Sequence, residues 1–213
     1  GQPKPSRLLR GATPRRIDEW QIAPELWDAV RGEVDKRGDD GQFILTGSAV
    51  PPKTDKIFHS GAGRFAWLRL RTMTLWESGD STGEVSLKSL FDGTEMVDGE
   101  SRIDLEQMAF LVCRGGWPKA VLKKSKKAAL AQAFEYYEAV TRSDISRVDG
   151  VERNPALAKR LMRSYARNQG SQASVGTLLS DVKANETESL GENTIYSYLK
   201  ALKKIFVIED SEA

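Results

Sequence analysis

Two adjacent carboxylates near the start of the chain have the residue types needed for metal-dependent chemistry. Asp18 and Glu19 follow Arg15–Ile17, which we expect to be a short strand, and Pro24 opens a helix close behind. At the end of a buried strand, one carboxylate can bind Mg²⁺ through water while its neighbour orients or deprotonates an attacking water. Acidic pairs are also common on solvated surfaces, and a buried strand prefers apolar residues to arginines. On these residues alone, a metal site and a solvated pair both stay open.

The residues that follow predict a helix and further strands that would position this pair. Apolar side chains recur at helical spacing from Glu25 to about Lys36, with charges on the other face. Phe43–Leu45 is a short apolar run that Thr46-Gly47-Ser48 terminates, which fits a buried parallel strand. After a loop, the run Phe65–Leu70 predicts another strand. The carboxylates and the Thr46–Ser48 hydroxyls would then each stand at the end of a strand.

Several runs of the sequence resemble one known family, and they occur in the same order. RRIDEWQIAPELWDAVR, GQFILTGSAVPP and HSGAGRFAWLRLRTMTLWE are similar to the second half of the ATPase core in a family of prokaryotic AAA+ ATPases. In that family a domain of unknown function (DUF4143) follows the core. The later runs CRGGWPKAV, YYEAVTRSDISRV and ENTIYSYLKALKKIFVIED match it as well. The resemblance therefore covers nearly the whole chain.

The resemblance implies an α/β plus all-α fold. Residues 1–80 would be the carboxyl-terminal half of a P-loop AAA+ parallel-sheet core, from the Walker B strand onward. Residues 81–213 would be a helical DUF4143-like domain, and the Gly/Ser/Asp-rich run at 78–83 is the expected boundary. The last part of that domain, at about 150–213, would be a winged helix-turn-helix.

The resemblance also implies roles for five residues in a Mg²⁺-dependent ATPase. Asp18 would bind the metal, Glu19 would be the catalytic carboxylate, Thr46 or Ser48 would sense the terminal phosphate of ATP, and Arg64 would act as an arginine finger on a neighbouring subunit. The alternatives are a polar turn after a strand and a surface arginine. The sequence contains no Gly-x-x-x-x-Gly-Lys-Ser/Thr loop. We therefore expect an ATPase fragment that neither binds ATP tightly nor hydrolyses it.

The last third of the chain predicts three helices and a strand. Asn154-Pro155 caps and opens a helix that runs to about Asn168, and Val175–Val182 forms the second. Asn193 is the expected cap of a third helix that ends near Lys204, and Phe206–Ile208 would be a strand. This order is typical of a winged helix, whose third helix enters the DNA major groove in DNA-binding versions.

The third helix supplies an alternative function, that of a binding module on a non-catalytic scaffold. Its outward residues would contact DNA, and they are Tyr196, Lys200, Lys203 and Lys204. Many winged helices attached to AAA+ cores contact only protein, so a protein partner stays open beside DNA. The net charge of +2 is too small to indicate global steering toward nucleic acid, so any such contact must be local.

Composition excludes several classes of site. One cysteine and one histidine, Cys113 and His59, exclude an internal disulfide and a His/Cys metal cluster. No apolar run approaches the roughly 20 residues that span a bilayer, so we expect a cytoplasmic protein with no membrane contact. An open sheet edge attracts partners, so we also expect self-association.

Overall fold

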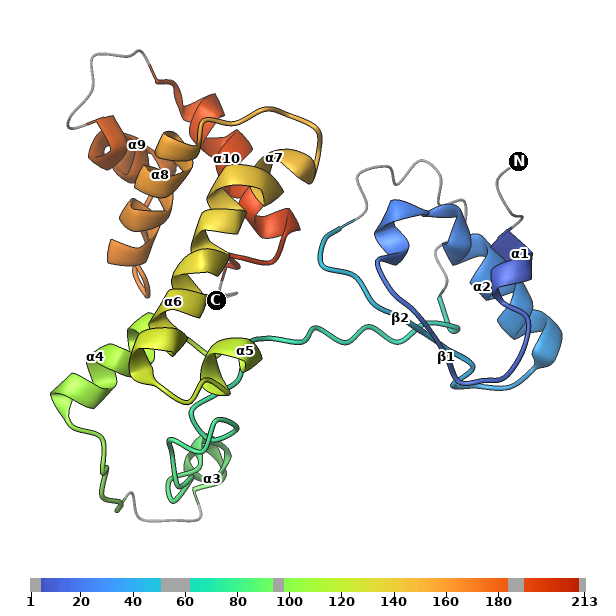
Figure 1. Ribbon diagram of the computed structural model, residues 1–213, viewed down its shortest axis with the longest axis horizontal. Helices are drawn as coiled ribbons and strands as arrows, with labels where there is room; N and C mark the ends of the chain where they lie inside the picture. The colour runs from blue at the N-terminus through green and yellow to red at the C-terminus, as the bar shows by residue number, and fades with distance from the viewer. Residues whose placement is uncertain (1–4, 51–61, 94–97, 184–189, 211–213) are drawn as a thin grey trace. The chain divides into compact units, whose positions relative to one another are not determined.

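The structure is a computed structural model that describes residues 5–50, 62–93, 98–183 and 190–210 (Figure 1). The expected loop at 51–63, with His59, lies largely outside the described residues. Contacts divide the chain into two compact units. One comprises Gly1–Trp67 with Val140–Ala213, and the other comprises Leu68–Ala139.

The chain is mostly helical, with 52% of its residues in helices and 3% in strands. The sheet has two parallel strands, β1 (Arg15–Ile17) and β2 (Phe43–Leu45). The expected carboxyl-terminal half of a P-loop AAA+ parallel-sheet core is therefore wrong. Phe65–Leu70 is not a strand in the described structure and pairs with neither β1 nor β2. Ile44 of β2 is 52% exposed, so this strand pair is not the buried centre of a wider sheet.

Local sequence explains the elements around the two strands. A short helix, α1 (Pro5–Leu8), precedes β1, and the 3-10 turn η1 (Trp20–Ile22) follows it. The helix α2 (Glu25–Arg37) then buries Leu26, Trp27 and Val30, which matches the expected helical spacing. It ends at Gly38, whose φ of 73° is the left-handed conformation that favours glycine at a helix end.

The second unit holds four helices, α3 (Leu87–Asp92), α4 (Leu105–Arg114), α5 (Pro118–Val121) and α6 (Lys126–Ala139). Helix α6 contacts both α4 and α5. The Asp104 side chain caps α4 by accepting a hydrogen bond from Gln107 N at 2.7 Å. Arg114, at the other end of α4, is buried and donates to Asp80 at 2.9 Å. This ion pair fixes the segment before α3 to the end of α4.

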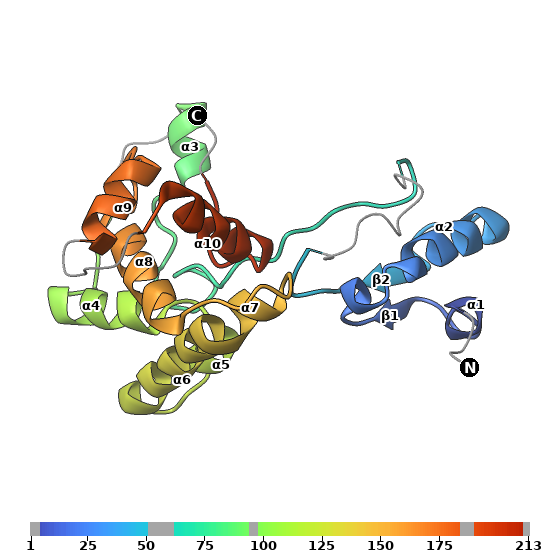
Figure 2. The same ribbon diagram turned by 90° about the horizontal axis from the view of Figure 1, so that it is seen from above.

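The carboxyl-terminal part of the first unit consists of helices and loops, with no strand among its described residues. The π-helical segment η3 (Val140–Asp144) leads into α7 (Ile145–Arg147), which is followed by α8 (Pro155–Arg167), α9 (Val175–Lys183) and α10 (Glu192–Lys204). Figures 1 and 2 show α9 beside both α8 and α10, in agreement with their contacts. The shared core consists of Leu157, Ala158, Leu161, Leu178, Val182, Ile195, Leu199 and Leu202.

The winged helix-turn-helix expectation is wrong in two respects. Phe206–Ile208 is not a strand, and Phe206 has a φ of 58°, which is outside the β region. The third helix starts at Glu192 with Gly191 as its N-cap, so Asn193 is inside the helix. The expected cap at Asn154 is confirmed, since its Oδ1 accepts from Ala156 N at 2.8 Å.

A buried arginine joins α7 and the following turn to α10. Arg153 is 6% exposed, and its guanidinium donates to both carboxylate oxygens of Asp149, at 2.7 and 3.0 Å. It also donates to Ile145 O at 2.7 Å and to Ser197 Oγ at 3.1 Å. Next to it, the Tyr198 hydroxyl accepts from the backbone N–H of Asn154 at 2.8 Å. These bonds hold the start of α8 on α10.

Crossing a bilayer requires a helix of about 20 predominantly apolar residues. Within residues 5–50, 62–93, 98–183 and 190–210, no helix is both long and apolar enough to cross a membrane.

Candidate functional site

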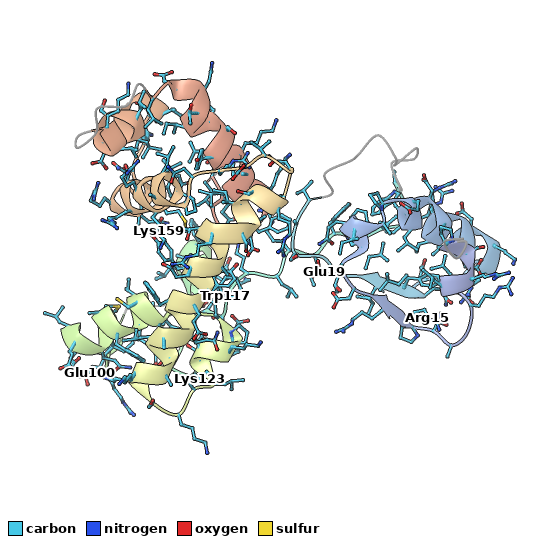
Figure 3. All side chains as sticks on the ribbon, turned by 45° about the horizontal axis from the view of Figure 1, so that its top comes forward. Arg15, Glu19, Glu100, Trp117, Lys123 and Lys159 are labelled. Atoms are coloured by element: carbon cyan, nitrogen blue, oxygen red, sulfur yellow. The ribbon has the colours of Figure 1, made fainter. Side chains whose placement is uncertain are left out.

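The ends of the two parallel strands bring four of the predicted residues together. Ile17 pairs with Leu45 in the parallel register, so the next residues, Asp18 and Thr46, lie at the same end of the strand pair. The backbone N–H of Thr46 donates to Ile17 O at 2.9 Å, and that of Trp20 donates to Thr46 O at 3.2 Å. Figure 3 shows Arg15 and Glu19 at opposite ends of the strand pair.

Asp18 is held by three neighbours but keeps access to solvent. Its Oδ1 accepts from the Thr46 hydroxyl at 2.6 Å and from the backbone N–H of Glu19 at 3.1 Å, and Arg16 lies 3.8 Å from its Oδ2. The hydrogen bond from Thr46 lowers the pKa of Asp18 below its ordinary value, and Arg16 adds to this effect. The side chain is 59% exposed. Asp18 is therefore an ionised, accessible carboxylate at neutral pH.

Glu19 has an unusual backbone conformation. Its φ of 53° and ψ of 40° place it in the left-handed region, which residues with a β-carbon rarely adopt. Its Oε2 accepts from Ser48 Oγ at 3.1 Å and also from the Gln21 side-chain amide. Strained residues of this kind cluster at functional sites. The conformation therefore marks Glu19 as a candidate for function independently of its charge.

The donor set fits a hard divalent cation. Two carboxylate–hydroxyl pairs lie at this end of the strands, Asp18 with Thr46 and Glu19 with Ser48. Mg²⁺ is usually held by one or two carboxylates, with water and phosphate oxygens completing its shell. Among the residues that the structure describes, no group of three or more His, Cys, Asp or Glu side chains is placed to hold a metal. A cation at Asp18 and Glu19 would therefore need oxygens from water or from a bound phosphate.

Aromatic packing supports the segment that carries the carboxylates. Trp20 directly follows Glu19, is 6% exposed, and has its ring centroid 5.3 Å from that of Trp27 on α2. The Trp27 ring stacks in turn on Phe65 at 3.8 Å and on Trp67 at 5.4 Å. These contacts fix η1 against α2, and thereby fix where Glu19 lies.

The structure does not bring Arg64 to the carboxylates. Its Nε donates to Asp35 Oδ1 on α2 at 2.6 Å, and its Nη1 donates to Ala62 O at 3.2 Å. Arg64 therefore pairs within its own chain and is not a free guanidinium.

The four residues predicted to contact DNA all lie on α10. Tyr196 is 54% exposed and Lys200 is exposed, whereas Lys204 is half-buried. Lys203 is exposed but forms an ion pair with Asp210. The opposite side of α10 packs into the helical core. Only Tyr196 and Lys200 are thus both exposed and outside a recorded ion pair.

Sequence reasoning missed Gln21, which donates to Glu19 and lies 3.4 Å from Ser48 Oγ. The residue stands two positions after Glu19 in the run Asp-Glu-Trp-Gln, but no rule of spacing assigns it a role. The contact between Gln21 and Glu19 depends on the path of η1, which the sequence does not predict.

The comparisons with known proteins identify one family. Residues 105–213, just over half of the chain, match the family described as Domain of unknown function (DUF8612). The chain belongs to the DUF8612 family. The DUF8612 match starts at α4 and includes α5 to α10, whereas the carboxylate pair lies before it. No curated protein and no solved structure matches the chain.

Proposed function

We propose that Asp18 and Glu19 form the cation-binding end of an ATP-hydrolysing site, in a chain related to AAA+ ATPases. The observation that supports this proposal most directly is the 2.6 Å hydrogen bond between Thr46 and Asp18. It joins the residues that follow the two parallel strands, so that an ionised carboxylate and a hydroxyl lie together at this end of the strand pair. The resemblance of the DEWQ and ILTGS runs to AAA+ sequences points to the same chemistry.

Each residue has a distinct task in this proposal. Asp18 binds Mg²⁺ with its ionised carboxylate, and the ion, when bound, neutralises charge on the phosphate oxygens. Glu19 orients the attacking water and accepts its proton. No donor among the described residues bonds Oε1 of Glu19, so this oxygen is left for water. Thr46 holds Asp18 and Ser48 holds Glu19, and either Thr46 or Ser48 would sense the terminal phosphate.

The proposal assigns cation binding to this chain but no ATP hydrolysis of its own. A Gly-x-x-x-x-Gly-Lys-Ser/Thr loop, which cradles the phosphates in such enzymes, is not in the sequence. We therefore expect weak ATP binding and no hydrolysis by this chain alone. Arg64 is left out of the assignment because its guanidinium is paired with Asp35.

Paramagnetic broadening by Mn²⁺, which substitutes for Mg²⁺, tests the proposal. In ¹⁵N-labelled protein at neutral pH, substoichiometric Mn²⁺ should broaden the backbone amides of Asp18, Glu19 and Thr46 before all others. Asp18→Asn should abolish this pattern, while Asp39→Asn, at an exposed turn, should leave it intact. Broadening spread evenly over the acidic surface would contradict the proposal. Adding ATP tests whether a nucleotide strengthens the same pattern.

The second candidate is a nucleic-acid or protein-binding role for α10. Its polar face is separated cleanly from its buried face, which holds Ile195, Tyr198 and Leu202. Helix α8 adds four basic residues and no acidic ones. Arg167 of α8 and Lys203 of α10 are paired with Asp181 and Asp210, so the positive charge that could attract a ligand with negative charge comes from the other basic residues of these helices.

Gel-shift titration at several salt concentrations tests the second candidate. Contacts with phosphates release counterions, so affinity for DNA should fall steeply as salt rises. Lys200→Ala should weaken binding and reduce this salt dependence, and Lys119→Ala, an exposed lysine of the other unit, should not. A DNA affinity that does not change with salt, or no DNA binding at low salt, would exclude DNA as the ligand and leave a protein partner.

A further inference from the structure

We propose that Gln21 and Gly47 form a positioning pair that sets the direction of the Glu19 carboxylate. The functional meaning of this inference rests on the cation site proposed above, because Glu19 is one of its two acids. The pair combines a buried side-chain amide from η1 with a glycine from the segment after β2. Neither residue is charged, and neither would contact the cation directly.

Hydrogen bonds place the Gln21 amide at the centre of the site. Gln21 is 7% exposed, and its Nε2 donates to Glu19 Oε2 and lies 3.4 Å from Ser48 Oγ. Ser48 Oγ itself donates to the same Glu19 oxygen at 3.1 Å. Two donors therefore converge on one oxygen of Glu19. The other oxygen is then directed away from them, which is the arrangement that a base facing water requires.

Gly47 makes room for this amide. A β-carbon at position 47 would lie 2.3 Å from Gln21 Oε1, closer than real β-carbon contacts allow, and 3.2 Å from Gln21 Cδ, so the end of the Gln21 side chain would have to shift. The backbone of Gly47 is not among those with a left-handed φ, so conformational freedom does not explain the glycine. A side chain at position 47 would therefore displace the Gln21 amide from its present place.

The oxygen of the Gln21 amide indicates that the side chain is not placed to complete its own hydrogen bonds. Gln21 Oε1 is buried and has no hydrogen-bond partner among the described residues. Buried acceptors are nearly always paired, and an exception calls for an explanation. The amide keeps an unpaired oxygen while its nitrogen serves Glu19 and Ser48. This is expected if its position is set by what Glu19 requires.

The test uses two readouts, one of which needs no metal. In the metal-free protein, the Gln21 side-chain NH₂ resonances should move toward those of exposed amides in Gly47→Ala and in Glu19→Ala. In Mn²⁺ titrations, Gln21→Met, which keeps the length of the side chain but removes the donor, should weaken binding about tenfold, as is typical when a residue that orients a metal ligand is lost. Gly47→Ala should do the same. Gly32→Ala is the matched control, because no atom lies within 4 Å of its added β-carbon.

A double variant tests whether the two residues act as a pair. In a Gln21→Ala background the space beside position 47 is empty, so adding Gly47→Ala should cause no further loss of Mn²⁺ affinity. Losses that simply multiply would contradict the pair. If Gly47→Ala leaves the Gln21 resonances unchanged, the inference is overturned. If those resonances move but the wild type binds no Mn²⁺, the pair stands and the cation site fails.

Discussion

The Thr46 hydroxyl donates to Asp18 Oδ1 at 2.6 Å, which ties the residue after β2 to the residue after β1. Because this bond stabilises the ionised carboxylate, it lowers the pKa of Asp18. The site thus has an acid that stays charged at neutral pH without being buried, so that a cation can reach it from solvent.

Thr46→Val should raise the pKa of Asp18 toward its ordinary value, because valine keeps the shape of threonine but cannot donate. A carboxyl ¹³C titration by NMR measures the change. Thr46→Ser retains the hydroxyl and should keep the pKa of Asp18 low. An unchanged Asp18 pKa in Thr46→Val would mean that the bond is not formed in solution.

Glu19→Gly should be more stable than Glu19→Ala, by about 1 kcal/mol in the free energy of unfolding. Both variants remove the carboxylate, but only glycine adopts the left-handed conformation at position 19 without steric cost. Urea denaturation of the two variants measures the difference. Equal stabilities, or a more stable alanine variant, would show that Glu19 is not held in this conformation.

Arg153→Ala should lower the free energy of unfolding by about 3 kcal/mol, because it leaves Asp149 and the Ile145 carbonyl without their buried donor. Arg163→Ala, an exposed arginine of α8, should change stability by less than about 0.5 kcal/mol. Thermal and urea unfolding compare the two variants. Similar losses of unfolding free energy in both variants would show that Arg153 does not join α7 to α10.

Acid should weaken the same ion pair in a predictable window. The hydrogen bond from Arg153 lowers the pKa of Asp149, so the carboxylate stabilises the fold above its unfolded pKa of about 3.9. That contribution is lost as the pH falls through the lower, folded pKa. Unfolding measured from pH 7 to pH 2 should therefore show less acid sensitivity in Asp149→Asn than in the wild type. Equal acid sensitivity would contradict the assignment.

Tyr198→Phe should cost about 1 kcal/mol, because the backbone N–H of Asn154 loses its acceptor at the start of α8. Tyr196→Phe is the matched control on the same helix, since its ring is 54% exposed and no hydrogen bond of its hydroxyl is recorded. Differential scanning calorimetry should give a lower Tm for Tyr198→Phe only. A lower Tm in both variants would point to a general effect of the hydroxyl on α10.

Short-range patterns predicted the local elements well. β2 lies at its apolar run, α2 lies where helical spacing places it, and α8 begins at its Asn-Pro cap, whereas β1 forms although two of its three residues are arginines. The extent of the sheet was not predictable in this way. The composition of Phe65–Leu70 predicts a strand, but a strand also requires a neighbouring strand with free N–H and C=O groups. No local pattern supplies that partner.

Some features of the candidate site could be predicted from the sequence, and others could not. The resemblance to AAA+ ATPases points to Asp18, Glu19, Thr46 and Ser48 from the sequence, and the structure pairs Thr46 with Asp18 and Ser48 with Glu19. The left-handed backbone of Glu19 could not be predicted, since glutamate has no preference for it. The role of Gln21 depends on the path of η1, which is set by the packing of Trp20 on α2.

The most direct test of the central claim is the affinity of Mn²⁺ for the wild-type chain and for Asp18→Asn, measured by electron paramagnetic resonance at neutral pH. We predict one site per chain in the wild type, and at least a tenfold loss of affinity in the variant. Equal affinity of the two proteins for Mn²⁺, or no saturable site in the wild type, would contradict the account.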